Sequence, residues 1–367
     1  MEKTKIGVIG CGNISGTYLK VARTFDILDV AACADAIFEL AKAKAAEYGV
    51  PSVSSVEKLL EDPDISIVLN LTPPAVHAGV ALRALKAGKN VYNEKPLAVQ
   101  RSEAQELLKS AAEHSLRVGC APDTFMGAGL QTCRKLIDDG AIGRPIGATA
   151  FMLGRGPEPW HPNPEFFYQP GGGPMFDMGP YYVTALVSML GPISRVTGSA
   201  QISFSERTIG SGPKKGNQIK VEIPTHIVGV MDFANGVVAN LITSFDVWAH
   251  QLPRIEIYGS EGTLSVPDPN TFGGPVRLWK PATKTWDDVP LLPLRAENSR
   301  SLGLADMATA IRSGRPHRAS GELAYHVLDV MHSIIDASRE GRHIEIASTC
   351  TRPAAMPTNL SLAVLDD

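Results

Sequence analysis

One lysine occupies a position at which a side chain could take part in chemistry. Lys95 follows the short stretch Asn90–Asn93, which is typical of a strand, and it precedes Pro96. The carboxyl ends of parallel strands form the edge at which such sheets bind ligands. A lysine at this edge can donate a hydrogen bond to a substrate hydroxyl, and its charge favours the deprotonated form of a neighbouring group. The alternative is a solvated loop lysine, but the strand end and the proline favour a functional role.

A second candidate stretch joins a run of glycines to an acid and two tyrosines. The glycines at 171–173 permit a close backbone turn, and Asp177 is placed to cap a helix predicted from about Met178 to Leu190. Tyr181 lies on the first turn of this helix, four residues after Asp177, so the two side chains can share a face. Considered alone, the stretch is explained more simply by a helix cap followed by core tyrosines.

The glycine turn near the N-terminus has the pattern of a dinucleotide site. After an apolar run ending at Ile9, Gly10 permits a tight turn and Gly12 lets the backbone approach a pyrophosphate, which the next helix can bind through its N–H groups. Ser15 replaces the usual third glycine, and a small residue still allows close packing. Asp35 ends the next apolar run, where an acid binds the ribose hydroxyls. An ordinary tight turn explains the glycines but not the acid, so we predict dinucleotide binding.

The elements that must position these residues fall into two patterns. Strands and helices alternate over residues 1–122, which predicts a doubly wound parallel sheet, the Rossmann fold, as the dinucleotide-binding domain. The predicted strands are 6–9, 28–32, 65–71, 90–93 and 117–120, and the predicted helices are one ending at Tyr48, 55–61, 75–87 and 102–114, the last with a capping box of Ser102 and Gln105.

Residues 123–367 are predicted to form a substrate-binding and oligomerisation domain. Asn235-Gly236 between two apolar runs predicts a hairpin, within a strand-like region from about residue 193 to residue 279. We expect a mainly antiparallel open sheet with helices on one face and the other face free for a partner subunit. The other predicted elements are helices at 129–139 and 321–339, a strand at 146–151, one strand over 219–233, and a loop at 154–174.

The composition excludes several classes of protein. The 367 residues contain 35 Lys and Arg against 38 Asp and Glu, a formal charge of −3, which implies neither a nucleic acid nor an anionic membrane as partner. The five cysteines are scattered without metal-binding spacing, so we expect reduced thiols and no metal. No signal peptide precedes the first strand and no apolar stretch could span a bilayer, which predicts a cytoplasmic protein.

These motifs, in this order, resemble those of the Gfo/Idh/MocA family of NAD(P)-dependent oxidoreductases, over nearly the whole chain. The Glu94-Lys95-Pro96 motif and the Asp177-x-Gly179-x-Tyr181 motif are specific to that family. The resemblance implies a Rossmann domain followed by an α/β domain with a large open sheet, and an NAD cofactor, with NADP less expected because Asp35 would repel a 2′-phosphate. The other matching segments are the glycine turn, Thr72-Pro73-Pro74 with His77, Ala87–Val91 and Tyr258–Gly262.

The resemblance also implies roles for individual residues. Lys95 would lie between nicotinamide and substrate, and Asp177 would orient the substrate. Tyr181 stands where most members have histidine, which resembles the glucose–fructose oxidoreductase and dihydrodiol dehydrogenase branches, where this tyrosine is the acid/base. Thr184 replaces the Asp or Asn of many members, which leaves the usual second substrate carboxylate without a counterpart here. The residues implied to bind the cofactor are Gly10, Gly12, Asn13, Ile14, Asp35, Thr72, Pro73, His77, Glu94 and Lys95.

The substrate is predicted from the side chains that precede the candidate helix. Trp160 and His161 lie in a loop of aromatic and polar residues, which suits a sugar with its apolar ring face and its rim of hydroxyls. A surface loop that closes a domain interface explains this segment equally well. Asp123 follows the last predicted parallel strand and is expected to face the same cleft.

Together these residues predict an oxidoreductase that transfers a hydride between NAD(H) and a secondary alcohol or ketone of a sugar, glycoside or cyclitol. Tyr181 would exchange the hydroxyl proton while Lys95 lowers its pKa. The alternative is a non-catalytic dinucleotide sensor or regulator on the same fold, and retention of both Lys95 and Tyr181 argues against it. A homodimer or homotetramer is expected, and a zinc alcohol dehydrogenase would need cysteine or histidine ligands that the sequence lacks.

Overall fold

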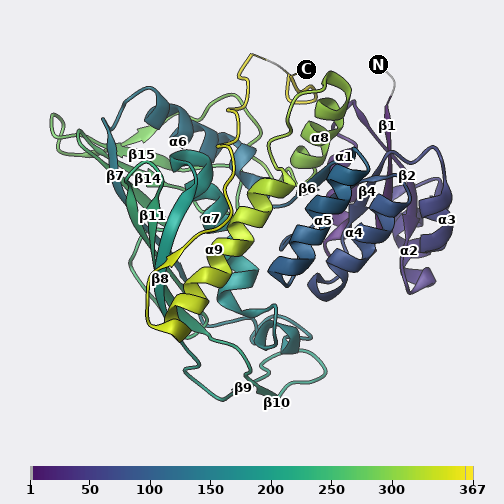
Figure 1. The fold of residues 1–367 in the computed structure, drawn as a ribbon, viewed down its shortest axis with the longest axis horizontal. Helices are drawn as coiled ribbons and strands as arrows, with labels where there is room; N and C mark the ends of the chain where they lie inside the picture. The colour runs from purple at the N-terminus through teal and green to yellow at the C-terminus, as the bar shows by residue number, and fades with distance from the viewer. Residues whose placement is uncertain (1–2, 360, 367) are drawn as a thin grey trace. The chain divides into compact units, whose positions relative to one another are not determined.

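The computed structural model describes residues 3–359 and 361–366, and the chain forms two compact units (Figure 1). The first unit contains the chain up to Gly127, then Pro293–Tyr325 and the segment that begins at Pro353. The second unit contains Ala128–Leu292 and His326–Arg352. The predicted outer limits of the domains, residues 1 and 367, lie outside the described residues.

The first unit is built on a sheet of six strands. These are β1 (Thr4–Ile9), β2 (Leu28–Ala34), β3 (Ser52–Val53), β4 (Ile67–Asn70), β5 (Asn90–Asn93) and β6 (Val118–Cys120). Their order is β3-β2-β1-β4-β5-β6, and each neighbouring pair is parallel. This arrangement confirms the predicted Rossmann fold. The strand order reverses between β1 and β4, which is where sheets of this kind bind ligands.

The helices of the first unit begin and end where local sequence directs. They are α1 (Ser15–Ala22), α2 (Phe38–Tyr48), α3 (Val56–Glu61), α4 (His77–Lys86), α5 (Arg101–Glu113) and α8 (Leu302–Ser313), with short 3₁₀ turns η1 (Pro74–Val76) and η2 (Thr124–Met126). Ser55 caps α3, because its hydroxyl accepts a hydrogen bond from the Lys58 N–H at 3.3 Å. The predicted capping box at α5 is wrong. The box lies two residues earlier, where Glu103 accepts a hydrogen bond from the Gln100 N–H at 2.8 Å.

The chain returns to the first unit after residue 292, so the division differs from the single boundary predicted at residues 122 and 123. Asp123 holds part of this returning segment. Its Oδ2 accepts hydrogen bonds from the N–H groups of Ser301 at 3.1 Å and Gly303 at 2.9 Å, where α8 begins. A carboxylate satisfies the first N–H groups of a helix in this way. The sequence analysis did not predict α8.

The C-terminal segment is fixed to the same unit by ion pairs. Arg318 contacts the Asp366 carboxylate at 2.7 Å and the buried Asp306 carboxylate at 2.5 Å, and Arg315 lies 2.8 Å from Asp306. Both arginines therefore bridge α8 to residues near the end of the chain.

The second unit contains a nine-stranded sheet and a small two-stranded one. The strands are β7 (Pro145–Leu153), β8 (Ile193–Gln201), β9 (Glu206–Thr208), β10 (Gln218–Lys220), β11 (His226–Phe233), β12 (Val238–Ser244), β13 (Ile255–Gly259), β14 (Thr263–Val266), β15 (Val276–Trp279), β16 (Trp286–Val289) and β17 (Ile344–Glu345). The large sheet has the order β16-β15-β14-β13-β7-β12-β11-β8-β17. Its pairings are antiparallel apart from β7 with β12, which confirms a mainly antiparallel open sheet.

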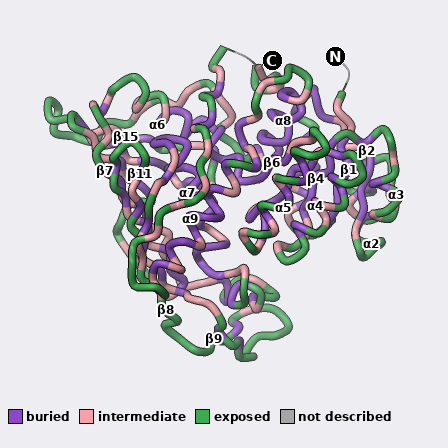
Figure 2. Tube along the Cα trace, viewed as in Figure 1, coloured by how far each residue is buried: buried purple, intermediate pink, exposed green. Residues whose placement is uncertain are grey.

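Two strand predictions in this unit have different outcomes. The hairpin predicted at Asn235-Gly236 is confirmed, because β11 and β12 pair across it. The single strand predicted over 219–233 is wrong, because its first residues belong to β10, which pairs only with β9 in the described chain. Most residues of β9, β10 and the segment that joins them are exposed, as Figure 2 shows.

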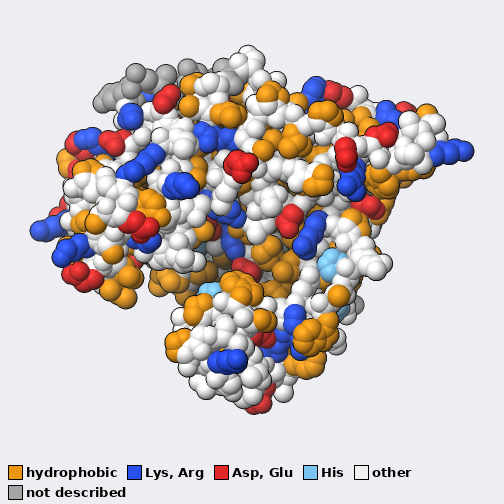
Figure 3. All heavy atoms as spheres, turned by 180° about the vertical axis from the view of Figure 1, so that it is seen from behind, with side chains coloured by type: hydrophobic (Ala, Val, Ile, Leu, Met, Phe, Trp, Pro, Cys, Tyr) orange, Lys and Arg blue, Asp and Glu red, His pale blue; other side chains and the backbone are white. Residues whose placement is uncertain are grey.

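Helices cover one face of the nine-stranded sheet. They are α6 (Ala128–Asp138), α7 (Gly173–Leu190) and α9 (Gly321–Glu340), with the 3₁₀ turn η3 (Glu165–Tyr168) before α7. The predicted start of α7 near Met178 is wrong. The helix begins five residues earlier, and Pro174 is compatible with its first turn, where the missing N–H leaves no hydrogen bond unmade. Asp177 therefore lies inside the helix and does not cap it. The surface in Figure 3 intermixes acidic and basic side chains, as the small net charge leads one to expect.

Candidate active site

Most of the predicted cofactor residues lie at one edge of the six-stranded sheet. Ile9 pairs with Ala34 on one side and with Asn70 on the other, and Asn70 pairs with Asn93. Four parallel strands therefore end at the same level, beside the switch in strand order. The predicted residues that follow these strand ends are Gly10, Asp35, Thr72, Glu94 and Lys95.

The glycine turn leaves its backbone open to a ligand. Gly10 has φ +99°, and a Cβ there would lie 2.6 Å from the Leu71 carbonyl carbon, so only glycine fits. A Cβ at Gly12 would meet nothing within 4 Å, which leaves space beside the backbone. Asn13 is exposed, and Ile14 at the N-cap of α1 makes no side-chain capping bond. The open space beside Gly12, at the N-terminus of α1, suits a phosphate.

Asp35 is held in one orientation by two backbone groups. Its Oδ2 accepts a hydrogen bond from the Cys11 N–H at 2.7 Å, and its Oδ1 accepts one from the Ile37 N–H at 2.8 Å. Each carboxylate oxygen can accept a further hydrogen bond, so ribose hydroxyls remain possible partners. The open glycine turn and this oriented acid, at the switch point of the sheet, fit an NAD molecule.

His77 joins the two loops that follow β4 and β5. Its ring is buried, with Nδ1 2.8 Å from the Pro96 oxygen and Nε2 2.6 Å from the Thr72 oxygen. Burial lowers the pKa of the imidazole, so the ring is neutral at pH 7 and donates from one nitrogen. Pro73, the residue after Thr72, is exposed at the start of η1. His77 thus lies between the loops that carry Thr72 and Lys95, and its single N–H is donated to one of the two oxygens.

Two asparagines that the sequence analysis did not select complete this arrangement. Asn70 Nδ2 donates to Asn93 Oδ1 at 3.0 Å, and Thr72 Oγ1 donates to Asn70 Oδ1 at 2.7 Å. Asn93 in turn donates to the Leu97 oxygen at 3.2 Å. Both asparagines are completely buried, and each is the last residue of its strand, so a polar residue at a strand end is the signal that could have identified them.

The Glu94-Lys95 pair follows β5 directly. Glu94 is buried, and its carboxylate accepts hydrogen bonds from the Tyr18 hydroxyl at 2.6 Å and from the Lys95 N–H at 2.8 Å. Lys95 itself is partly exposed. The sequence analysis missed Tyr18, which lies on α1 without any motif around it.

Asp123 lies elsewhere than predicted. In place of a cleft position it is completely buried, and burial raises the pKa of its carboxyl group. Its Oδ2 is occupied by the N–H groups that begin α8. The structure therefore gives this carboxylate a structural role within the first unit.

In the second unit, α7 carries the other predicted catalytic residues. Asp177 is partly exposed and Tyr181 is buried, one helical turn apart. Tyr182 points to the sheet, because its hydroxyl donates to the Phe151 oxygen at 3.2 Å and burial raises its pKa to about 12. Thr184 is buried farther along the helix.

The loop before α7 presents aromatic rings. Trp160 is 67% exposed, and its ring centroid lies 5.5 Å from that of His161, which in turn lies 5.2 Å from that of Phe167. The glycine run lets this loop approach the helix, because a Cβ at Gly172 would lie 2.5 Å from the Phe166 oxygen. The structure therefore brings the predicted substrate loop next to the start of α7.

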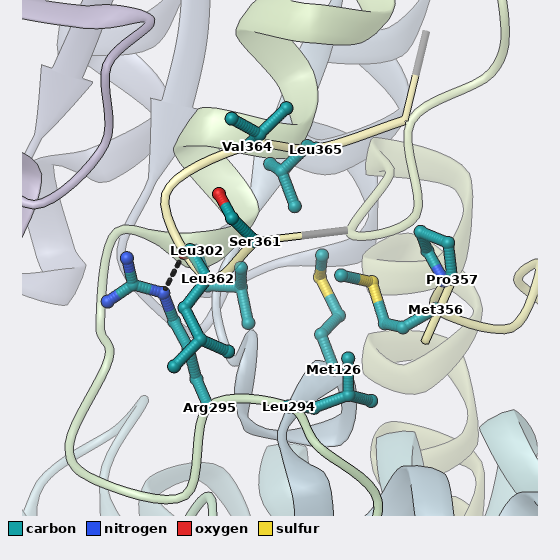
Figure 4. A pocket seen from close by; sticks show the side chains of 10 residues that line it. All are labelled: Met126, Leu294, Arg295, Leu302, Met356, Pro357, Ser361, Leu362, Val364 and Leu365. Carbon is teal, nitrogen blue, oxygen red and sulfur yellow. Dashed lines mark hydrogen bonds between the residues drawn. The ribbon is translucent and has the colours of Figure 1, made fainter. Parts of the chain in front are cut away.

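A small cavity in the first unit is lined by none of the candidate site residues. It measures about 20 Å³, enough for one water, and apolar side chains such as Met126, Leu302 and Met356 line it (Figure 4). Over residues 3–359 and 361–366, no group of three or more His, Cys, Asp or Glu side chains is arranged to hold a metal ion. None of the described helices is both long and apolar enough to cross a membrane.

Comparison with known proteins identifies both parts of the chain. Residues 4–121 match the family model described as "Oxidoreductase family, NAD-binding Rossmann fold" of GFO/IDH/MocA. Residues 130–265 match the model of the GFO/IDH/MocA C-terminal domain. The two matches follow each other along the chain and together include well over half of it.

Individual relatives match over long stretches. The chain is 27% identical to the 1,5-anhydro-D-fructose reductase of Ensifer adhaerens, over 93% of this chain and 98% of that protein. It is 25% identical to the levoglucosan dehydrogenase of Pseudarthrobacter phenanthrenivorans, over 63% of each chain. The crystal structure of an NAD-binding oxidoreductase from Klebsiella pneumoniae has the same fold, with a TM-score of 0.83 at 21% identity, over 94% of this chain and 100% of that one.

Proposed function

Because this chain belongs to the GFO/IDH/MocA family of NAD-binding oxidoreductases, we propose that it is a dehydrogenase or reductase of sugars, glycosides or cyclitols. The reaction interconverts a secondary alcohol and its ketone. The observation that best supports a catalytic role is the position of Lys95, directly after β5 and at the same sheet edge as the glycine turn.

The first unit would hold NAD through residues whose geometry fits it. The N–H groups at the start of α1 and the open backbone at Gly12 would receive the pyrophosphate, and Asp35 would accept from the ribose hydroxyls. Bound NAD supplies the hydride acceptor for oxidation, and NADH the donor for reduction. His77 and the asparagine pair keep the surrounding loops in place.

A proton relay of Lys95 and Tyr181 would handle the substrate hydroxyl. Tyr181 takes the hydroxyl proton during oxidation and returns it during reduction. A free phenol has a pKa near 10, and an ammonium group within hydrogen-bonding reach lowers it by favouring the phenolate. Asp177, one turn before Tyr181 on α7, would accept a hydrogen bond from a second hydroxyl and so orient the sugar.

The relatives and the aromatic loop both support a sugar-like substrate. The names of the two relatives are those of an anhydro-sugar reductase and an anhydro-sugar dehydrogenase. Trp160 and His161 offer ring faces on which the apolar face of a pyranose can stack, and the carboxylate of Asp177 suits its hydroxyl rim. We therefore propose sugars without a free reducing end as the first candidates.

A substrate screen tests this function directly. NADH formation would be followed with levoglucosan and a panel of sugars, methyl glycosides and cyclitols, and NADH consumption with 1,5-anhydro-D-fructose. Tyr181→Phe serves as the control, since turnover that survives in it does not come from the proposed relay. NAD binding without turnover of any member of the panel would overturn the proposal in favour of a dinucleotide sensor.

We also propose that the chain forms a homodimer or homotetramer through the uncovered face of the nine-stranded sheet. Val230 on β11 and Val238 on β12 are exposed there, while alternate residues are buried. Light scattering at micromolar concentration should give a multiple of the 39.2 kDa chain mass. Val230→Glu should lower that mass, whereas Leu40→Glu on α2, equally apolar and exposed, should not. A monomeric wild-type protein would contradict the proposal.

The state of the buried thiols supports a cytoplasmic location. Cys11, Cys33, Cys120 and Cys133 are buried and form no disulfide. Such residues remain reduced in the cytoplasm, where we propose that the enzyme works. Localisation of a tagged full-length chain by cell fractionation tests this placement.

A further inference from the structure

The two carboxylate oxygens of Glu94 accept hydrogen bonds from different parts of the first unit. Oε1 accepts a hydrogen bond from the Tyr18 hydroxyl at 2.6 Å, and Oε2 accepts one from the Lys95 N–H at 2.8 Å. Glu94 is only 9% exposed, so neither bond is replaced easily by water. One buried group thus connects α1 with the backbone of the candidate catalytic lysine.

Tyr18 is itself fixed at both ends. Its side chain is 0% exposed, and its backbone oxygen accepts a hydrogen bond from Ser301 Oγ at 3.2 Å. Burial, with the charge of Glu94, raises the pKa of the phenol, so it remains a donor at neutral pH. Ser301 has φ +123°, a conformation that costs free energy and is held by the bond from its N–H to Asp123. The hydroxyl of Tyr18 is therefore presented to Glu94 from a rigid support.

We propose that Tyr18 and Glu94 are positioning residues that hold the main chain of Lys95 in a fixed position relative to α1. The helix receives the pyrophosphate at its N-terminus, and Tyr18 lies on its first turn. Binding of the dinucleotide to α1 is thereby coupled to the placement of the Lys95 main chain through two hydrogen bonds. The role of this coupling in catalysis rests on the proposed function, whereas the coupling itself does not.

The chain offers a matched control in Tyr92. Like Tyr18, it is 0% exposed and belongs to the first unit, but its buried hydroxyl has no hydrogen-bond partner among the described residues. Tyr92→Phe removes the same atom as Tyr18→Phe without removing a hydrogen bond. A difference between the two variants therefore reports the bond to Glu94.

The experiment measures hydrogen exchange at the Lys95 amide in the full-length protein, with and without saturating NADH. In Tyr18→Phe we expect exchange about tenfold to a hundredfold faster, the range for losing a hydrogen bond to a charged group, and a smaller slowing by NADH. Tyr92→Phe should exchange like wild type. NADH affinity, measured by fluorescence, should stay within about threefold, while kcat for the substrate found in the screen falls with little change in KM.

Two substitutions of Glu94 keep the test decisive if Tyr18→Phe does not fold. Glu94→Gln can still accept from the Lys95 N–H and donate to the Tyr18 oxygen, so it should retain slow exchange, whereas Glu94→Ala should lose it. Equal Lys95 exchange in Tyr18→Phe and Tyr92→Phe, or in Glu94→Gln and Glu94→Ala, would overturn the positioning role even in an active enzyme. The expected exchange pattern without any sugar turnover would instead support the coupling and overturn the proposed function.

Discussion

The two units hold their candidate site residues by different means. In the first unit, polar side chains bind one another at the sheet edge: Asn70 contacts both Asn93 and Thr72 at 3.0 Å or less. In the second unit, α7 is buried along most of its length, and the loop before it is packed by aromatic rings, with the Phe166 and Phe167 centroids 4.1 Å apart. Hydrogen bonds fix directions, while apolar packing fills space and tolerates exchange of similar volumes.

This contrast explains how one scaffold can combine a constant ligand with a variable one. A cofactor that never changes favours a rigid polar site, in which an unmatched hydrogen-bonding group is costly. A substrate that differs between relatives favours rings and loops that can be replaced. We therefore expect large effects at the few polar contacts and graded effects in the aromatic loop.

The largest effect is expected at Tyr181, which lies in the second unit but is proposed to act through its polar hydroxyl. Tyr181→Phe should keep the fold and NAD affinity but lower kcat about 10²- to 10⁴-fold, the usual contribution of a positioned acid or base. Lys95→Met should cost at least as much, because it removes a substrate donor and the charge that favours phenolate. The double variant should be about as slow as the slower single one, since groups that act as a unit are not additive. Steady-state kinetics on the screened substrate measures all three.

Tyr182→Phe is the control for this prediction. Its hydroxyl contacts the Phe151 oxygen, so its loss should leave kcat nearly unchanged. An inactive Tyr182→Phe with an active Tyr181→Phe would mean that the motif is aligned one residue out. If both variants are active, His161 becomes the next candidate for the relay.

The second effect concerns Asp35 in the first unit. NAD should be preferred over NADP, and Asp35→Ser with Ala36→Arg should shift the ratio of kcat/KM toward NADP by about tenfold or more, because an arginine can bind the 2′-phosphate. Serine cannot make both bonds of the Asp35 carboxylate to Cys11 and Ile37, so a loss of thermal stability should accompany the switch. A wild-type enzyme that prefers NADP would refute the assignment of Asp35.

The third effect is a loss of stability in acid, larger in the first unit. Burial lowers the pKa of His77 and His317 in the first unit and of His326 in the second. The unfolded chain binds protons near pH 6.5, where these folded imidazoles stay neutral, so their contribution to stability is complete above that pH and is lost below it. The Tm should fall between about pH 7.5 and about pH 5.5.

Hydrogen exchange over the same pH range, corrected for its intrinsic pH dependence, compares the units. Protection of β4 and β5 should fall more than that of β11 and β12. His77→Asn should reduce the pH dependence in the first unit alone. A Tm that stays constant over this range would show that burial does not hold these rings neutral.

The smallest effect is expected in the aromatic loop. Trp160→Ala should raise KM for a sugar a few-fold and leave kcat nearly unchanged, because it removes a ring proposed to stack on the sugar. The stability should hardly change, because this ring is largely exposed. Phe167→Ala, which removes a buried ring, is the contrasting variant and should destabilise the second unit. An unchanged KM in Trp160→Ala over the whole substrate panel would place the sugar elsewhere.

The sequence predicted best the features that depend on neighbouring residues. The glycine turn, the end of β5 and the hairpin at Asn235-Gly236 follow from backbone requirements of residues close together in the chain. Features that depend on distant partners could not be predicted. Asp123 reaches the start of α8 across 178 positions, and Tyr18 reaches Glu94 across 76. No periodicity or spacing records such pairs.

The start of α7 illustrates a third case. Glycines 171–173 and Pro174 predicted a turn before the helix, yet the helix includes Gly173 and Pro174 in its first turn. Proline is compatible with that position and with a loop alike, so local sequence does not decide between them. A partner distant in the sequence lies against this turn, because a Cβ at Gly173 would lie 2.5 Å from the Ile223 side chain.

The return of the chain to its first unit limits how genes for such proteins can recombine. A single crossover after residue 127 would join an Asp123 from one parent to the Ser301 and Gly303 amides of the other. Exchange of the whole second unit requires junctions near residues 128, 292, 326 and 352, and the third falls inside α9. Chimaeras should therefore fold best when both parents carry the same α9, which makes this helix the natural constraint on shuffling cofactor and substrate specificities.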